Sequence, residues 1–258
     1  TYLRDYEIVA HLWQKAATRV SLQSWVRGEP WVLVFGHSEI CRSALDNLNR
    51  LMFKRIVEYV LMLPESSNRR IWFFLDELKA MGRLGGLDSL LNQGRSKGAC
   101  VVMGLQSIEG LDAVYGSKEA NELLSQTANK IILRCNGAGT TDWASAIFGK
   151  YETISTNLSR SYGVRGRGNG TSQNRGSTEC IMTRDVVQAG EVLNLPVASF
   201  EAGISGFASI ASVGRFSLRI PPRYLKKMVL SKSKETPAFV PRAIPGGQVA
   251  RESVAPAK

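Results

Sequence analysis

The stretch Ile71-Trp72-Phe73-Phe74-Leu75-Asp76-Glu77 (IWFFLDE, residues 71–77) decides the fold of this chain. Its unbroken apolar run is typical of a strand buried inside an α/β sheet. Two carboxylates follow directly after the last apolar residue. Because ligands bind at the carboxyl ends of the strands in parallel sheets, we expect Asp76 and Glu77 at a ligand-binding edge.

Apolar runs and amphipathic stretches alternate on both sides of this segment. Further strands are predicted at Trp31–Phe35, Ala99–Leu105 and Lys130–Cys135. Helices are predicted over residues 5–17, 43–63, 88–94 and about 117–128, and Pro64 ends the long one. This alternation predicts an α/β fold, a mostly parallel sheet covered by helices.

The composition changes after about residue 150. The chain has 258 residues and a net charge of +11, which favours a polyanionic partner such as nucleic acid. Residues 153–178 contain no acid and are rich in glycine, so they are predicted to be a mobile, DNA-binding loop, although a solvated loop is an equal alternative. Its candidate phosphate ligands are Arg160, Arg165, Arg167 and Arg175. From about residue 231 the composition predicts a disordered tail.

Four side chains are candidates for nucleotide chemistry. In a nucleoside triphosphatase, Asp76 would hold Mg²⁺ through its water shell and Glu77 would activate the attacking water. Arg95 lies in the turn GRSKG (94–98) and could act as an arginine finger on a neighbouring subunit. Gln106 ends the next strand and could bond the γ-phosphate or the water. Each has a simpler alternative: Asp76 and Glu77 could be ordinary solvated acids, and the turn with Arg95 could be a helix-capping loop. Gln106 could cap the helix that follows it.

Several segments, in this order, resemble one known family. They are SLQSWV (21–26), FFLDE (73–77), GRSKG (94–98), VVMGLQS (101–107), KIILR (130–134) and EVLNLP (191–196). Together they resemble the motor domain of type IV secretion coupling proteins of conjugation. These are the TraD/TraG/VirD4/TrwB-like proteins, which are related to the FtsK and HerA pumps.

This resemblance implies a RecA-like fold and a set of partners for the intact protein. We expect a homo-hexameric, ATP- and Mg²⁺-dependent DNA translocase at the cytoplasmic face of the bacterial inner membrane, with its membrane anchor outside this chain. Single-stranded DNA, a relaxase or relaxosome and a type IV secretion channel are the implied partners. Residues 1–17 would end an inserted helical domain, 18–222 would form the C-terminal half of the motor, and 223–258 a flexible tail.

The sequence departs from the family in one respect. It contains no GxxxxGK[ST], and its only Gly-Lys pair, Gly149-Lys150, is followed by Tyr151. The backbone cradle and lysine that hold the β- and γ-phosphates are therefore absent, and this chain alone is expected not to hydrolyse ATP. In the family, the phosphate-loop strand lies between the strand that ends in Gln106 and the strand Lys130–Cys135, and here it would be missing. Strand 131–135 would then either stand apart from the other three strands or pair with the wrong neighbour. A catalytically silent DNA-binding or adaptor domain and a double-stranded DNA pump remain as alternatives.

Overall fold

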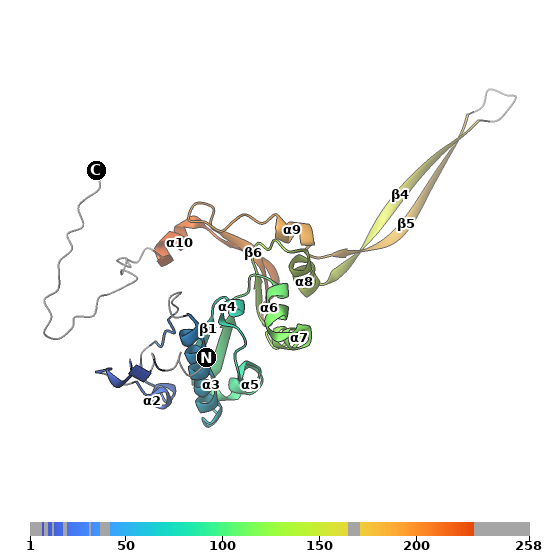
Figure 1. The fold of residues 1–258 in the computed structure, drawn as a ribbon. Helices are drawn as coiled ribbons and strands as arrows, with labels where there is room; N and C mark the ends of the chain where they lie inside the picture. The colour runs from blue at the N-terminus through green and yellow to red at the C-terminus, as the bar shows by residue number, and fades with distance from the viewer. Residues whose placement is uncertain are drawn as a thin grey trace, which may run out of the picture.

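Two small sheets, their helices and a long projecting ribbon make up the molecule (Figure 1). The structure, a computed structural model, describes residues 7, 10–11, 13–17, 20–30, 32–36, 42–164 and 171–229. It leaves out the side chains of 160–164, 171–175 and 228–229. The strands are β1 (Ile71–Leu75), β2 (Ala99–Met103), β3 (Lys130–Ile132), β4 (Lys150–Val164), β5 (Thr171–Asp185), β6 (Ile204–Ile210) and β7 (Gly214–Ile220). The helices are α2 (Leu22–Val26), α3 (Arg42–Leu61), α4 (Leu78–Met81), α5 (Leu87–Gln93), the 3₁₀ turn η1 (Gly94–Lys97), α6 (Ile108–Tyr115), α7 (Ser117–Ser125), α8 (Ala138–Phe148), α9 (Ala189–Leu193) and α10 (Pro222–Val229).

The main core forms where α3 packs against β1. The helix predicted over 43–63 is confirmed as α3. Its buried face consists of Ala44, Leu48, Phe53, Ile56, Val57 and Val60. The ring of Phe53 meets that of Phe73 edge to face, with centroids 6.1 Å apart. Burial of these side chains is the main stabilising contribution, about 25 cal/mol for each Å² of apolar surface removed from water.

The strands β1 and β2 are parallel neighbours, which confirms the mixed α/β class. Their register runs from Ile71 opposite Ala99 to Leu75 opposite Met103. In the described residues this parallel sheet is two strands wide.

The prediction that β1 is buried on both faces is wrong. Phe73 and Leu75 are buried, whereas Trp72 is 55% and Phe74 70% exposed. The two exposed rings stack on each other at a centroid distance of 5.8 Å. A five-residue strand has two faces, and in the described residues helices cover only one of them.

The strand predicted at Trp31–Phe35 is also wrong for the residues that the structure describes. Residues 32–36 have no regular structure, and no described strand pairs with them. Leu33 and Phe35 pack against the core, while Val32 and Val34 are exposed. The side chains of this segment thus alternate between buried and exposed, as in a strand. The segment is not a strand because no described strand forms backbone hydrogen bonds with it.

The fourth predicted strand, Lys130–Cys135, lies in a second sheet. It is shorter than predicted, and β3 pairs antiparallel with β6, which pairs antiparallel with β7. In the described residues this strand therefore stands apart from β1 and β2, which is one of the two arrangements expected for a sheet without the phosphate-loop strand. On one face, Ile132 and Phe207 pack with Phe148 of α8. On the other face, Ile131 and Phe216 are exposed.

The mobile loop predicted over 153–178 is instead a two-stranded ribbon. β4 and β5 pair antiparallel from Lys150 opposite Asp185 to Val164 opposite Thr171. The ribbon projects far from the body (Figure 1). Its threonine and apolar residues favour a strand, whereas its glycine content had led to the prediction of a loop. Arg165 and Arg167 lie outside the described residues.

The first residues of the predicted tail are helical. Residues Pro222–Val229 form α10, in which Pro222 occupies the first helical position that proline favours. Residues 230–258 lie outside the described part of the chain.

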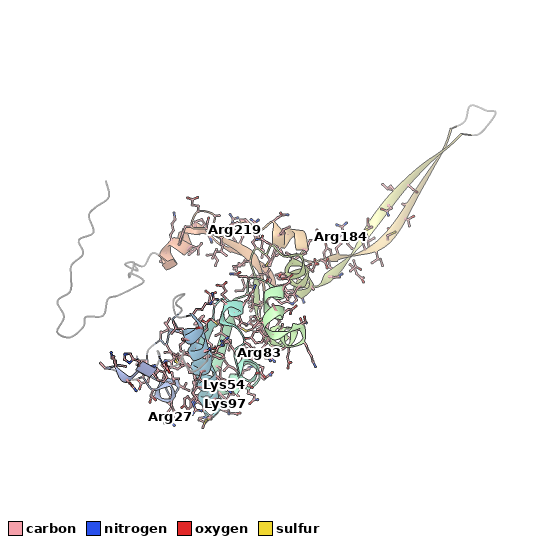
Figure 2. The ribbon with its side chains drawn as sticks, in the orientation of Figure 1. Arg27, Lys54, Arg83, Lys97, Arg184 and Arg219 are labelled. Carbon is pink, nitrogen blue, oxygen red and sulfur yellow. The ribbon has the colours of Figure 1, made fainter. Side chains whose placement is uncertain are left out.

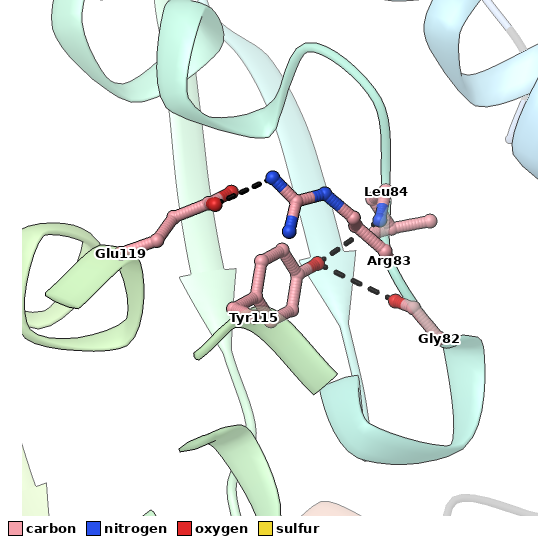
Figure 3. Close-up of polar contacts among 5 residues, drawn as sticks. All are labelled: Gly82, Arg83, Leu84, Tyr115 and Glu119. Carbon is pink, nitrogen blue, oxygen red and sulfur yellow. Dashed lines mark hydrogen bonds and ion pairs between the residues drawn. The ribbon is translucent and has the colours of Figure 1, made fainter. Parts of the chain in front are cut away.

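A tyrosine fixes the loop behind α4 (Figure 3). The hydroxyl oxygen of Tyr115 accepts a hydrogen bond from the Leu84 amide at 3.1 Å and donates one to the Gly82 carbonyl at 3.4 Å. Above the ring, Arg83 forms an ion pair of 2.5 Å with Glu119. α6 and α7 thereby hold the segment that follows Asp76 and Glu77.

A carboxylate joins α6 to α8. Thr140 donates its hydroxyl proton to Glu109 across 2.7 Å and accepts the Ile108 amide at 3.0 Å. A β-carbon at Gly139 would stand only 2.5 Å from the Glu109 carboxylate, so a side chain there would displace this carboxylate from its present position. The hydrogen bond from Thr140 lowers the pKa of Glu109 below its ordinary value.

We expect Tyr115→Phe to lower the free energy of unfolding by about 1–3 kcal/mol, because it leaves the buried Leu84 amide without an acceptor. Urea unfolding followed by circular dichroism measures this loss. Tyr224→Phe, which removes the hydroxyl of an exposed ring on α10, is the matched control and should change nothing. Equal midpoints for Tyr115→Phe and wild type would contradict the role given to this hydroxyl.

Thr140→Val should raise the pKa of Glu109 toward its ordinary value, since it removes the donor and keeps the shape. A lowered pKa stabilises the fold at pH values above the ordinary pKa, and that stability is lost as the pH falls through the folded-state value. The variant should therefore lose less stability on acidification than wild type. A carbon-13 NMR titration of the Glu109 carboxyl tests the shift, with Thr140→Ser as the variant that retains it.

Candidate functional site

The parallel pairing brings two sequence-predicted residues into contact. Glu77 follows β1 and Gln106 follows β2, and both strands end at the same edge of the sheet. The Gln106 side-chain amide donates a hydrogen bond of 2.7 Å to the Glu77 carboxylate. Both side chains are exposed, so a ligand could reach them.

Glu77 has an uncommon backbone conformation. Its φ of 54° and ψ of 59° are left-handed, and no other non-glycine residue in the described part of the chain has a positive φ. For an L-residue with a long side chain this conformation costs roughly 1–2 kcal/mol. Such strain is concentrated at functional sites, where it fixes the direction of a side chain.

Asp76 lies beside the end of β2. A β-carbon built on Gly104 would stand 3.0 Å from the Asp76 carboxylate, so glycine leaves room for this side chain. The Gly104 amide bonds the Leu75 carbonyl at 2.9 Å, and its carbonyl accepts the Leu78 amide at 3.0 Å. These bonds fix the backbone on both sides of the two acids.

The edge fits a magnesium–nucleotide ligand better than a bare metal ion. Within the described ranges, no three His, Cys, Asp or Glu side chains gather closely enough to hold a metal. Mg²⁺ commonly keeps several waters and binds through one or two carboxylates together with substrate phosphates. Asp76 could supply one such carboxylate, while Glu77 and Gln106 offer an acceptor and an amide to a water or phosphate.

Arg95 lies at the opposite end of the sheet. It belongs to η1, directly before β2, whereas the acids follow β1. Five residues at about 3.3 Å each separate the two ends by roughly 15 Å. The structure therefore does not bring Arg95 to Asp76 or Glu77 of its own chain.

Two of the four candidate DNA ligands, Arg160 and Arg175, fall on the described part of the ribbon. The ladder places Arg160 opposite Arg175, near the far end of β4 and β5. Figure 2 shows Arg184 at the ribbon's base, on the side of the body away from Lys97. Arg160 and Arg175 were candidates from the sequence, which did not predict the strands that carry them.

Two supporting residues were not predicted. Ser107 caps α6 by accepting the Gly110 amide at 3.0 Å, and it fixes the backbone directly after Gln106. Thr140 binds Glu109 from 31 residues away, a contact that no local pattern indicates. The serine one residue before an amphipathic helix was the one signal available.

Comparison with known proteins gives consistent matches. Residues 3–212 match the family described as the type IV secretion-system coupling protein DNA-binding domain. The coupling protein TraD of Escherichia coli (strain K12) is 23% identical over 230 residues, covering 87% of this chain and 30% of TraD. The unbound bacterial conjugative coupling protein TrwBdeltaN70 matches with a TM-score of 0.58 and 25% identity, over 79% of this chain and 44% of that chain. Plasmid coupling protein TrwB in complex with ADP and Mg²⁺ gives a TM-score of 0.58 and 24% identity, over 86% and 46% of the two chains.

The chain spans less than half the length of these relatives, from 30% to 46%. The family match nevertheless covers most of this chain and includes both residues that meet at the sheet edge. The mixed α/β fold with its parallel pair agrees with the solved relatives. This chain therefore belongs to the coupling proteins of type IV secretion systems.

Proposed function

We propose that this chain is part of a hexameric, ATP-driven translocase that delivers single-stranded DNA and its relaxase to a type IV secretion channel. The observation that carries the proposal is the hydrogen bond between Gln106 and the strained Glu77 at the end of two parallel strands. A side chain whose direction is fixed at the cost of backbone strain is typical of a catalytic group.

The three residues at this edge would share the work of ATP hydrolysis. Asp76 would bind Mg²⁺ through water, and the ion would neutralise charge developing on the phosphates. Glu77 would orient and activate the attacking water as a general base. Gln106 would bond the γ-phosphate or that water, and would exchange its bond to Glu77 as the phosphate leaves.

The arginine finger would act between subunits. Arg95 lies roughly one strand length from the acids of its own chain. A neighbouring subunit that presents its acidic edge would bring this guanidinium to a bound γ-phosphate. The proposed active site is thus completed only where two subunits of the hexamer meet.

The ribbon would contact DNA. Like charges directly opposite in a ladder are destabilising, and Arg160 faces Arg175 across the ribbon. A DNA phosphate backbone would supply a counter-charge to both arginines, and the acid-free run 153–178 contains no carboxylate that would repel it.

The site of action would be the cytoplasmic face of the inner membrane. Among the helices of the described residues, none is long and apolar enough to cross a bilayer. Residues 1–17, 18–222 and 223–258 keep their proposed assignments as domain insertion, motor half and tail, with the first turns of the tail helical.

A catalytically silent DNA-binding or adaptor domain is the second candidate. The sequence contains no GxxxxGK[ST], so the residues named above lack a phosphate cradle within these 258 residues. A phosphate-binding loop in the same reading frame would favour the motor, and its absence would favour the adaptor.

We expect Glu77→Gln in the full-length coupling protein to reduce ATP turnover by about 10²-fold or more, because the charge that activates water is lost. Nucleotide binding should remain nearly unchanged, since Asp76 is retained. Steady-state hydrolysis and binding of a fluorescent nucleotide measure the two effects. Turnover within a few-fold of wild type would exclude Glu77 as the base.

The same position should show a gain in stability with Glu77→Gly. Glycine removes a left-handed penalty of roughly 1–2 kcal/mol, offset by about 0.5–1 kcal/mol of backbone entropy. Thermal unfolding should therefore occur at the same or a higher temperature than in wild type. Lys79→Gly, at an ordinary helical position of α4, is the matched control and should destabilise the chain.

Replacing Arg160, Arg165, Arg167 and Arg175 by alanine should flatten the salt dependence of DNA binding. Each phosphate contact with single strands contributes about 0.7 to the log–log slope, so four contacts remove up to about 3. Filter binding of an oligothymidylate measures the slope. Alanine at Arg55 and Lys118, two exposed cations of the body, should leave it unchanged, and an equal slope in the fourfold variant would place the DNA site elsewhere.

A further inference from the structure

Two loops are tied together at the end of the β1–β2 sheet that lies away from the acids. One loop, residues 64–70, precedes β1, and the other, residues 94–98, precedes β2. The Ser66 amide bonds the Ser96 carbonyl at 3.0 Å, and the Ile71 amide bonds the Gly98 carbonyl at 2.8 Å. These backbone bonds fix the two loops as one unit.

A third contact makes this unit tighter. The guanidinium of Arg69 donates to the Pro64 carbonyl at 2.8 Å and to the Lys97 carbonyl at 3.3 Å. Gly98 has a φ of +87°, and a β-carbon there would stand 2.5 Å from the Arg69 carbonyl, so the loops approach more closely than any other residue allows. Figure 2 places Lys97 at this end of the body.

Between the loops lies a hollow of about 660 Å³ with cationic and hydroxyl groups in its wall. Arg70 comes from the first loop and Arg95 from the second. The hydroxyl-bearing residues in the wall are Ser66, Ser67 and Ser96. A di- or triphosphate group has room here, and both kinds of donor match its oxygens.

Arg70 is held in place before any ligand arrives. One of its terminal nitrogens donates to the Ser67 and Arg69 carbonyls, each at 2.7 Å. Both bonds use the same nitrogen, Nη1, so Nη2 is a further donor that an anion could use. Because its orientation is already fixed, binding an anion costs little side-chain entropy.

The charge balance of the hollow is positive. Glu65 also lines it, but its carboxylate is 3.8 Å from the Lys97 ammonium. Among the ion pairs of the described residues, none neutralises Arg70 or Arg95. The hollow therefore presents two guanidinium groups to an incoming anion.

We propose that this hollow is a preformed site for the terminal phosphates of a nucleotide, in which Arg70 acts together with Arg95. The nucleotide is one held by a neighbouring copy, because this chain's own acids lie at the far end of the strands. Only the assignment of the nucleotide to a neighbouring copy rests on the proposed function. The recognition of a polyphosphate by Arg70 follows from the loop geometry.

The test is calorimetric titration of the purified chain with inorganic pyrophosphate at low salt. Wild type should bind it, and Arg70→Gln and Arg95→Gln should each weaken binding about tenfold or more, the effect of losing a hydrogen-bonded charge. Lys118→Gln, an exposed cation away from the hollow, should bind as wild type. Arg95→Gln keeps the test valid if Arg70→Gln disturbs its loop, which circular dichroism would reveal.

Three outcomes would overturn the proposal: no pyrophosphate binding by folded wild type, unchanged binding in the folded arginine variants, or displacement of pyrophosphate by an oligonucleotide at equal phosphate concentration. The last would make the hollow a DNA-backbone site. Glu77→Gln should leave pyrophosphate binding intact. Failure of the ATPase proposal would therefore appear in turnover alone, and failure of this one in pyrophosphate binding alone.

Discussion

The parallel register between β1 and β2 is the constraint on which the positions of the other functional groups depend. Because both strands run in the same direction, the residues after Leu75 and after Met103 emerge at one edge. The residues before Ile71 and before Ala99 emerge at the other. One edge is acidic and the other basic, so the sheet has opposite charges at its two ends. Two copies arranged head to tail would place unlike edges together, which is the contact that generates rings.

A series of hydrogen bonds through α6 and α8 connects the acidic edge to the base of the ribbon. α6 begins immediately after Gln106, and its Glu109 is bonded to Thr140 of α8. The other end of α8 is fixed in turn, because Ser145 donates to the Val187 carbonyl at 2.6 Å and the Val186 amide bonds Gly149 at 2.9 Å. A movement of α6 at the edge would therefore be transmitted to the base of the ribbon rather than absorbed between the helices.

Local sequence signals predicted the parts of the fold that depend on local chemistry. IWFFLDE gave both a strand and the position of its acids, and the amphipathic period of α3 gave a helix of nearly the right length. Contacts between distant segments were beyond such signals. The antiparallel pairing of β3 depends on β6, more than 70 residues later, and Thr140 approaches Glu109 only after α8 has packed. The ribbon was not predicted because its glycine and arginine residues are typical of a loop, although its threonines favour a strand.

The exposed apolar faces of the two sheets share one explanation. Parallel sheets occur almost only with both faces covered, yet Trp72 and Phe74 are exposed on β1. Ile131 and Phe216 are exposed on the second sheet, which is antiparallel. β2 has a described partner on one side only, and so does β3. A further strand and its helix, inserted between these two edges, would pair both and cover both apolar faces. The family resemblance implies a phosphate-loop strand at that position, and the exposed aromatic rings are consistent with it.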